Sequence, residues 1–174
     1  IGYADRYARI PYCRTTEFTR KYFDDYKKTL PYIKFIGEQF KKYLPERYEA
    51  QKKAWDNTHI DFKIPETPFT TITLNKNFRT ACHYDKGDLE EGFGNLAVLE
   101  GGEYTGGYTI LPKYGVGVDC RSCDLALFDV HQLHGNTEIK RIGNAERISI
   151  VCYFRKKMTE CGSAEEELER VKNK

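Results

Sequence analysis

Short apolar runs separated by glycine-rich turns occupy residues 66 to 158, and this pattern restricts the possible folds more than any other feature. The runs include LAVLE, YTILP, LALFDV and RISIVCYF. Apolar runs of this length, bounded by turn residues, are typical of strands rather than helices. Strands spaced so closely predict an antiparallel barrel or sandwich.

The first 65 residues predict helices instead. Thr15 and Thr16 are suitable N-cap residues for a helix that ends near Leu30, and Pro31 predicts the start of a second helix that ends near Pro45. Aromatic and apolar residues recur at helical spacing in the second stretch, namely at Tyr32, Ile36, Phe40 and Tyr43. We therefore expect a single α+β domain, in which helices in residues 1–65 support a β core in residues 66–158. Residues 159–174 predict a detachable C-terminal helix or tail.

Composition adds several expectations. The chain has 174 residues, which suits one domain, and its net charge of +2 favours a nucleic-acid partner only through local basic patches. It has no apolar run of the roughly 20 residues that span a bilayer and no signal-like start, which predicts a soluble intracellular monomer, cytoplasmic or nuclear. Its six cysteines predict reduced thiols. Cys120 and Cys123 form a lone CxxC, which predicts a turn rather than a zinc site.

The segment TITLNKNFRTACHYD, residues 71–85, separates by parity into two unlike faces. The even positions are mostly apolar: Ile72, Leu74, Phe78, Cys82 and Tyr84. The odd positions are mostly polar: Thr71, Thr73, Asn75, Asn77, Arg79, Ala81, His83 and Asp85. A polar face without Lys or Glu indicates a lined cavity rather than a solvent-washed surface.

The polar face ends in His83 and Asp85, and a His-x-Asp pair on a strand supplies two ligands of the 2-His-1-carboxylate triad of non-haem iron oxygenases. The pair alone is weak evidence. A later strand delivers His131 and His134 into a turn, and the next strand carries Arg147. We expect His134, beside Gly135, to be the third ligand and His131 to be a neighbour. A guanidinium at Arg147 could bind a carboxylate in a bidentate pair.

Three pieces of the chain carry a resemblance to a known family. The pieces NKNFRTACHYDKGD, GNLAVLEGGEYTGGYTILPKYGVGVDCRSCDLALFDVHQLHGNTE and RISIVCYF resemble the TET/JBP family of 2-oxoglutarate oxygenases. The resemblance implies a double-stranded β-helix, and oxidation of the 5-methyl group of cytosine or thymine in DNA. It also implies that His83, Asp85 and His134 bind Fe(II) as the catalytic centre. Arg147 would bind 2-oxoglutarate, with O₂ as the second cosubstrate.

The resemblance also implies roles in substrate binding. Asp88 matches a position that contacts the pyrimidine edge in relatives, and Arg155 stands where better-known TET members place a base-contacting His. An ionised carboxylate only accepts hydrogen bonds, so Asp88 favours the amino group of 5-methylcytosine over the carbonyl oxygen of thymine. Arg155 could instead hold a phosphate. Arg79, on the polar face, is a candidate for a second contact to the cosubstrate or around it.

Two alternatives remain open at the level of sequence. A related oxygenase that acts on a protein side chain or a small molecule would carry the same four residues. A non-catalytic reader of modified bases would have no need of all four.

Overall fold

The computed structural model describes residues 1–172, which form two compact units. The first unit contains residues 1–72, residues 87–92 and the C-terminal part of the chain from Cys152. The second unit contains residues 73–86 and 93–151. The β-rich segment predicted at residues 66–158 therefore contributes to both units, because residues 87–92 and the stretch from Cys152 pack with the helices.

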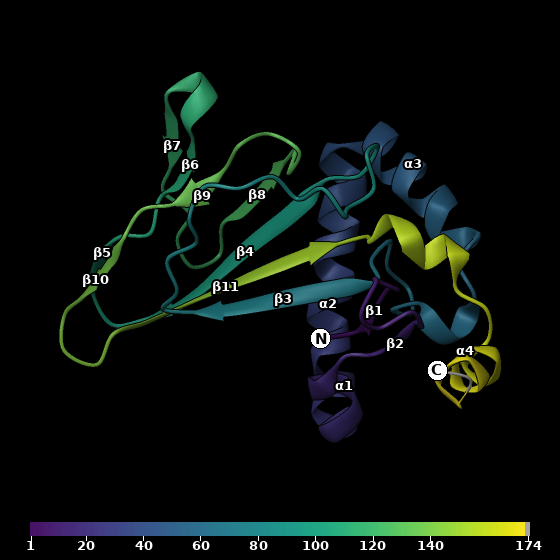
Figure 1. The fold of residues 1–174 in the computed structure, drawn as a ribbon. Coiled ribbons are helices and arrows are strands. Elements are labelled where there is room, and N and C mark those ends of the chain that lie inside the picture. The colour runs from purple at the N-terminus through teal and green to yellow at the C-terminus, as the bar shows by residue number, and fades with distance from the viewer. Residues whose placement is uncertain (173–174) are drawn as a thin grey trace. The chain divides into compact units, whose positions relative to one another are not determined.

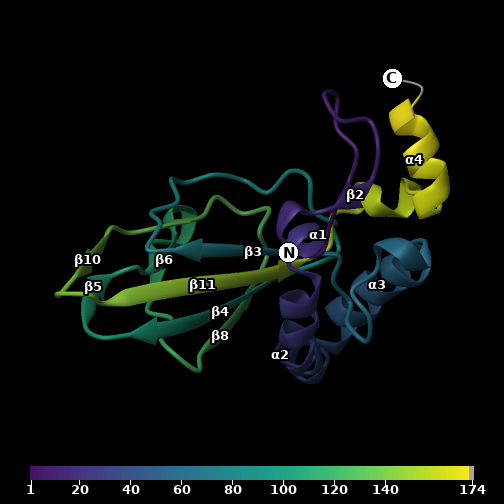
Figure 2. The same ribbon diagram turned by 90° about the horizontal axis from the view of Figure 1, so that it is seen from below.

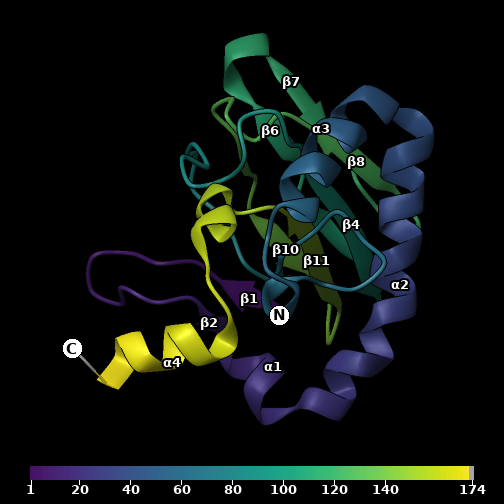
Figure 3. The ribbon, with the colours of Figure 1, turned by 90° about the vertical axis from the view of Figure 1, so that its right-hand side faces the viewer.

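The first unit is mainly helical, and α1 is followed almost directly by the long helix α2 (Figure 3). A small hairpin precedes them, because β1 pairs antiparallel with β2. The elements of this unit are β1 (Tyr3–Ala4), β2 (Arg14–Thr15), α1 (Glu17–Lys21), α2 (Phe23–Tyr43), α3 (Pro45–Asp56), the 3-10 helices η1 (Ile60–Phe62) and η3 (Lys156–Glu160), and α4 (Ala164–Lys172).

The predicted break between the first two helices is displaced. Thr16 is the N-cap of α1, as the sequence predicts, but the chain breaks at Tyr22 and then continues as one helix through Pro31 to Tyr43. Proline has no N–H, so the backbone carbonyl four residues before Pro31 receives no helical hydrogen bond. Pro31 is exposed, so this carbonyl lies on the solvent side of the unit. Ile36 and Phe40 of the predicted stripe are buried, whereas Tyr32 and Tyr43 are exposed. The buried residues of α2 are Tyr26, Ile33, Ile36, Gly37 and Phe40.

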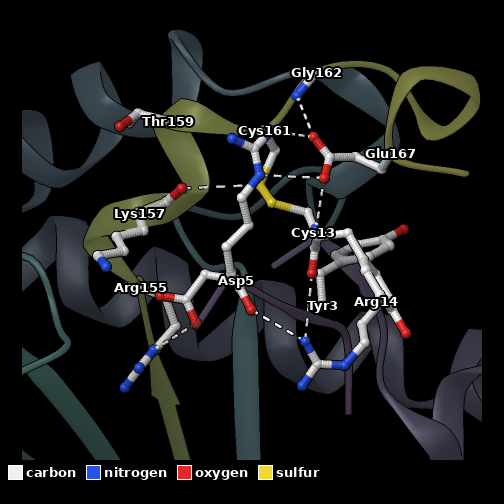
Figure 4. The surroundings of a disulfide bond; sticks show 12 residues. Tyr3, Asp5, Cys13, Arg14, Arg155, Lys157, Thr159, Cys161, Gly162 and Glu167 are labelled. Atoms are coloured by element: carbon white, nitrogen blue, oxygen red, sulfur yellow. Dashed lines mark hydrogen bonds and ion pairs between the residues drawn. A yellow bond between two sulfur atoms is a disulfide. The ribbon is translucent and has the colours of Figure 1, made fainter. Parts of the chain in front are cut away.

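A disulfide joins the two ends of the chain within the first unit (Figure 4). Cys13 and Cys161 are 148 positions apart in sequence, and their Cα atoms lie 5.9 Å apart. The prediction of six reduced thiols is wrong for this pair, because only the fold brings the two side chains together. The other four cysteines are free, and Cys123 adopts a left-handed turn conformation with φ of 72°, in agreement with the predicted turn.

The C-terminal helix α4 is not detachable, contrary to the expectation from its charged sequence. Glu167 on this helix is 2% exposed. Its carboxylate accepts hydrogen bonds from the Cys13 amide at 2.7 Å, the Gly162 amide at 3.0 Å and the Arg6 guanidinium (Figure 4). Burial alone would raise the pKa of Glu167, but these hydrogen bonds outweigh it and lower that pKa. The charged group thus fastens α4 to the N-terminal loop.

The second unit consists of antiparallel strands and short connections. A four-stranded sheet has the order β3-β11-β4-β8, a three-stranded sheet has the order β7-β6-β9, and β5 pairs with β10. Figures 1 and 2 show β3, β11 and β4 as the long strands of the first of these sheets. Only the first two residues of β3 and the last two of β11 belong to the helical unit. The strands are β3 (Thr71–Lys76), β4 (Gly94–Gly101), β5 (Tyr104–Gly106), β6 (Thr109–Leu111), β7 (Val116–Val118), β8 (Leu125–Phe128), β9 (Gly135–Asn136), β10 (Ile139–Arg141) and β11 (Glu146–Tyr153), with the 3-10 helix η2 (Pro112–Tyr114) between β6 and β7.

The predicted strand over residues 71–85 is shorter in the structure. Strand β3 ends at Lys76, Asn77 turns the chain with a φ of 52°, and the following residues form only isolated bridges. The two sets of side chains still differ in exposure. Leu74, Phe78 and Tyr84 from the apolar set are 46%, 58% and 52% exposed. Most of the polar set is half-buried, and its predicted role as a cavity lining stays a prediction.

Each unit has its own apolar core. In the strand unit, Leu96, Val98 and Cys120 pack against Ala126, Phe128 and Val151. In the helical unit, Phe62, Phe154 and Met158 pack around the disulfide. Within residues 1–172 the structure contains no helix that is long and apolar enough to cross a membrane.

Candidate metal and cosubstrate site

Three side chains in the strand unit converge on one point. His83 and His134 form an antiparallel bridge, in which each amide donates to the carbonyl of the other at 2.8 and 3.1 Å. The Asp85 amide donates to the Val130 carbonyl at 3.2 Å, which brings the carboxylate beside both rings. His83, Asp85 and His134 each offer one ligand atom, and these atoms lie within 4.8 Å of one another. The three ligands that the sequence analysis predicted are therefore brought together by the fold.

Hydrogen bonds orient both imidazoles toward the same point. His83 Nδ1 lies 2.9 Å from the Ala81 carbonyl, and His134 Nδ1 lies 2.8 Å from the Gln132 carbonyl. A carbonyl only accepts, so each Nδ1 carries a proton and Nε2 is the ring nitrogen that can offer a lone pair to a metal. The two Nε2 atoms lie 3.1 and 3.6 Å from the Asp85 carboxylate oxygens. Two imidazole nitrogens and a carboxylate form a donor set that fits a divalent transition metal.

The residues after His134 explain why the sequence there reads His-Gly-Asn. A Cβ atom at Gly135 would lie 2.9 Å from the Thr80 carbonyl oxygen and 3.0 Å from the Cys82 amide nitrogen, so only glycine allows this close approach. Asn136 Oδ1 accepts a hydrogen bond from the Thr80 amide at 2.8 Å, and the Asn136 amide donates to the Thr80 carbonyl at 3.1 Å. Gly135 and Asn136 therefore hold the loop with His83 and Asp85 against the strand that follows His134.

His131 has a different environment, as the sequence predicts. Its Nδ1 lies 3.1 Å from Asp129 Oδ1, and its amide donates to the same oxygen at 2.9 Å. Gln132 Nε2 donates to the other Asp129 oxygen at 3.0 Å. Burial would raise the pKa of Asp129, but the hydrogen bonds from Gln132 and His131 lower it. Asp129 thus stabilises the turn whose Gln132 carbonyl orients His134.

Arg147 is buried on β11, with 3% of its surface exposed. Within the described chain its Nε atom has no hydrogen-bond partner. A Cβ atom at Gly107 would lie 3.0 Å from this Nε, so the glycine leaves room for the guanidinium. A buried guanidinium nitrogen without a hydrogen-bond partner is costly, and an anionic ligand that accepts from it would remove the cost. This observation fits a bound dicarboxylate such as 2-oxoglutarate.

Three predicted residues remain: Arg79, Asp88 and Arg155. Arg79 is in the same unit and is exposed, so its predicted cosubstrate contact stays a prediction. Asp88 and Arg155 belong to the helical unit, where Arg155 lies 3.3 Å from both the Asp88 and the Asp5 carboxylates. Burial opposes the charge on Arg155, but Asp5 and Asp88 outweigh it and raise the pKa of the guanidinium.

The sequence analysis assigned no role to Asn77, Gly107 or Asp129. Asn77 has a positive φ, and its side chain bonds the backbone of Arg147. The signal for Gly107 was present in the Gly106-Gly107 turn, but a sequence does not show which side chain a glycine makes room for. Asp129 preceded a predicted ligand in the run FDVHQLH, where a short-range turn cap could have been proposed.

The fold and the site define a class: a mixed helix and sheet protein with an antiparallel β core that carries a two-histidine, one-carboxylate cluster. Residues 2–156 match the Tet_JBP family model, described as the oxygenase domain of the 2OGFeDO superfamily. The chain belongs to this family, which generally uses Fe(II) and 2-oxoglutarate.

Two curated relatives are similar to most of the chain. Thymine dioxygenase JBP1 of Trypanosoma brucei brucei is 38% identical over 163 residues, which cover 92% of this chain and 19% of the relative. The bifunctional helicase and thymine dioxygenase JBP2 of Leishmania tarentolae is 36% identical over 159 residues, which cover 89% of this chain and 14% of the relative. The chain therefore spans less than a fifth of the length of these relatives.

A solved structure supports the fold. NgTET1 in complex with 5mC DNA matches with a TM-score of 0.71 and 15% sequence identity, over 99% of this chain and 69% of that one. At this identity the match concerns the fold alone. The predicted α+β class with a double-stranded β-helix is confirmed by this match together with the antiparallel sheets.

Proposed function

We propose that this chain is a catalytic domain that uses Fe(II), 2-oxoglutarate and O₂ to hydroxylate the 5-methyl group of a pyrimidine in DNA. The observation that carries the proposal is the convergence of His83, Asp85 and His134, with both imidazole Nε2 atoms directed to one point. Three protein ligands leave coordination positions for the cosubstrate and O₂. Bound iron supplies the oxidising chemistry, and the protein supplies orientation.

Arg147 has the second role in the proposal. Its buried guanidinium binds the distal carboxylate of 2-oxoglutarate, while the keto-acid end reaches the metal. Such a pair fixes both the charge and the direction of the cosubstrate, because the planar donors match a carboxylate. Gly107 keeps the space beside Nε free for this purpose.

The substrate class rests on the relatives. The curated proteins that share 36% to 38% identity with the chain are named thymine dioxygenases, which supports a 5-methylpyrimidine in DNA as the substrate. A base inside a duplex would have to leave the stack to reach the metal. With a net charge of only +2, the phosphate contacts would come from local groups rather than from the whole surface.

The choice between methylcytosine and thymine depends on Asp88. The preference for methylcytosine predicted from sequence needs an Asp88 carboxylate that can accept from the base. In the structure Asp88 is 5% exposed and forms an ion pair with Arg155, so its charge is already partnered. This pair, together with the names of the relatives, favours thymine as a second candidate substrate.

The experiment that tests the proposal is incubation of the chain with Fe(II), 2-oxoglutarate and matched DNAs that carry 5-methylcytosine or thymine at the same position. Mass spectrometry of the nucleosides then identifies the product. A 5-hydroxymethyl product on either DNA supports the proposal, and the ratio of the two rates decides the base. Consumption of 2-oxoglutarate stimulated only by a peptide or a small molecule would favour the related oxygenase class. Tight DNA binding without product in the presence of both cofactors would favour the reader.

A further inference from the structure

Two asparagines hold the segment 77–80, which leads from β3 to the metal ligands His83 and Asp85. Asn77 lies at the start of the segment and contacts β11, the strand that carries Arg147. Asn136 is the second residue of β9, the strand that begins directly after His134, and it contacts the end of the segment. The two asparagines therefore connect the same segment to two different parts of the candidate site.

The contact between Asn77 and Arg147 is reciprocal. The Asn77 amide donates to the Arg147 carbonyl at 2.8 Å, and the Arg147 amide donates to Asn77 Oδ1 at 2.8 Å. Asn77 adopts φ of 52°, a left-handed conformation that asparagine tolerates better than most residues. Asn77 Oδ1 thus accepts the hydrogen bond that a backbone carbonyl would accept if β3 continued beside β11. Both backbone polar groups of Arg147 are fixed by this one residue.

This contact bears directly on the guanidinium. Arg147 is 3% exposed and Gly107 packs against its Nε, so the side chain has little freedom to compensate for a shift of its backbone. A small displacement of a group that binds a carboxylate in a bidentate pair costs much of the interaction, because the geometry is specific. The position of the cosubstrate carboxylate therefore depends on Asn77.

Asn136 makes equivalent contacts elsewhere. Its Oδ1 accepts from the Thr80 amide at 2.8 Å, and its own amide donates to the Thr80 carbonyl at 3.1 Å. Its side-chain nitrogen donates to the Thr137 carbonyl at 2.9 Å and to the Phe78 carbonyl at 3.4 Å, so these contacts stay within the loop and around β9. It fixes the loop that delivers His83 and Asp85 relative to His134, so it bears on the metal rather than on the cosubstrate.

From these contacts we infer that Asn77 is a positioning residue for 2-oxoglutarate, acting through Arg147, and that Asn136 positions the metal-bearing loop. The inference rests on the proposed function. It assigns the two asparagines separable effects, one on cosubstrate affinity and one on metal affinity.

The test compares Asn77→Gly and Asn136→Ala with the unaltered chain. Glycine at position 77 keeps the left-handed backbone and its N–H while it removes the acceptor of the Arg147 amide. Dissociation constants for Fe(II), and then for 2-oxoglutarate at saturating metal, are measured without O₂. Asn77→Gly should weaken 2-oxoglutarate binding about tenfold and change Fe(II) binding by less than about twofold, and Asn136→Ala should do the reverse.

Two further variants serve as controls. Asn144→Gly makes the same chemical change at an exposed turn residue close to Arg147 in sequence and should alter neither constant. Gly107→Ala places a Cβ 3.0 Å from Arg147 Nε and should reproduce the effect of Asn77→Gly on 2-oxoglutarate. In turnover assays, saturating 2-oxoglutarate should restore the rate of Asn77→Gly, because only the affinity is changed.

Equal weakening of both constants in Asn77→Gly, or no change in the 2-oxoglutarate constant, would overturn the inference while leaving the proposed function intact. An unaltered chain that binds Fe(II) but no 2-oxoglutarate would overturn both. Should Asn77→Gly not fold, Asn77→Asp and Asn77→Ser are compared. Asn77→Asp keeps the acceptor oxygen of the Arg147 amide and should retain both Fe(II) and 2-oxoglutarate binding, whereas Asn77→Ser, with a shorter side chain, should retain Fe(II) binding and weaken 2-oxoglutarate binding. Equal 2-oxoglutarate constants in these two variants would overturn the inference.

Discussion

His131 and His134 are separated by only two residues, but their hydrogen bonds direct their ring nitrogens to different groups. His134 Nδ1 faces a backbone carbonyl, so its Nε2 is directed toward Asp85 at 3.6 Å. His131 Nδ1 faces the Asp129 carboxylate. A ligand histidine is thus distinguished by an Nε2 atom that faces the other ligands, and the sequence alone does not show where this nitrogen points.

We predict that His134→Ala abolishes turnover and weakens Fe(II) binding by at least about a hundredfold, because two ligands cannot hold the metal in a facial site. His131→Ala should weaken Fe(II) binding by no more than about tenfold, since its ring contacts the Asp129 carboxylate rather than belonging to the ligand cluster. Titration of each variant with Fe(II) measures this. Reversed effects of the two variants would show that the ligand assignment is wrong.

Arg147→Gln tests the cosubstrate assignment. Glutamine keeps a polar side chain but is shorter and loses the charge and the paired donors, so the 2-oxoglutarate requirement should rise steeply, by on the order of 2 to 5 kcal/mol. Fe(II) binding should remain nearly unchanged. Rates of succinate formation over a range of 2-oxoglutarate concentrations give the measurement, and an unchanged requirement would remove Arg147 from this role.

Parity reasoning located the functional residues because their environments alternate along the chain. It grouped His83 with Asp85 and separated Arg147 from its apolar neighbours, and the structure brings the first two together with His134. The same reasoning placed Asn77 in the polar set but gave no sign of its role, because the left-handed turn and the contact to the Arg147 backbone leave no mark on the alternation. Residues that act through backbone contacts leave no periodic signal.

At the scale of elements, the attachment of α4 depends on the charge of the Glu167 carboxylate. The pKa of Glu167 is below its ordinary value of 4.5, so the stability that this group contributes is present above that pH and is lost as the pH falls through the lowered pKa. We predict that Glu167→Gln lowers the melting temperature at neutral pH and weakens its dependence on pH below about 4.5. Thermal denaturation followed by circular dichroism between pH 3 and 7 measures both. Identical pH profiles for the variant and the unaltered chain would contradict this account.

Helix positions were predicted better than helix boundaries. The sequence located helical stretches on both sides of Pro31, but the structure joins them in α2 and places the break at Tyr22. A proline disfavours a helix interior, yet an exposed position with a solvated carbonyl tolerates it. The role of α4 was missed for a related reason, since an acidic sequence does not reveal which carboxylate has buried partners.

For the whole molecule, the disulfide is the main long-range covalent constraint that the structure adds. Closing a loop of 148 positions stabilises the fold by about 4 to 5 kcal/mol in the chain-entropy description. Cys161→Ser should therefore lower the melting temperature by several degrees or more, whereas Cys123→Ser, at an exposed free thiol, should leave it unchanged. Addition of dithiothreitol should destabilise the unaltered chain and have no effect on Cys161→Ser.

The most direct test of the central claim is an anaerobic titration of the Fe(II)-loaded chain with 2-oxoglutarate, followed by visible absorption. Chelation of Fe(II) by a 2-oxo acid produces a charge-transfer band. The account predicts that the band appears and saturates in the unaltered chain, is absent in His134→Ala, and requires much more 2-oxoglutarate in Arg147→Gln. Absence of the band in the unaltered chain at saturating Fe(II) and 2-oxoglutarate would contradict it.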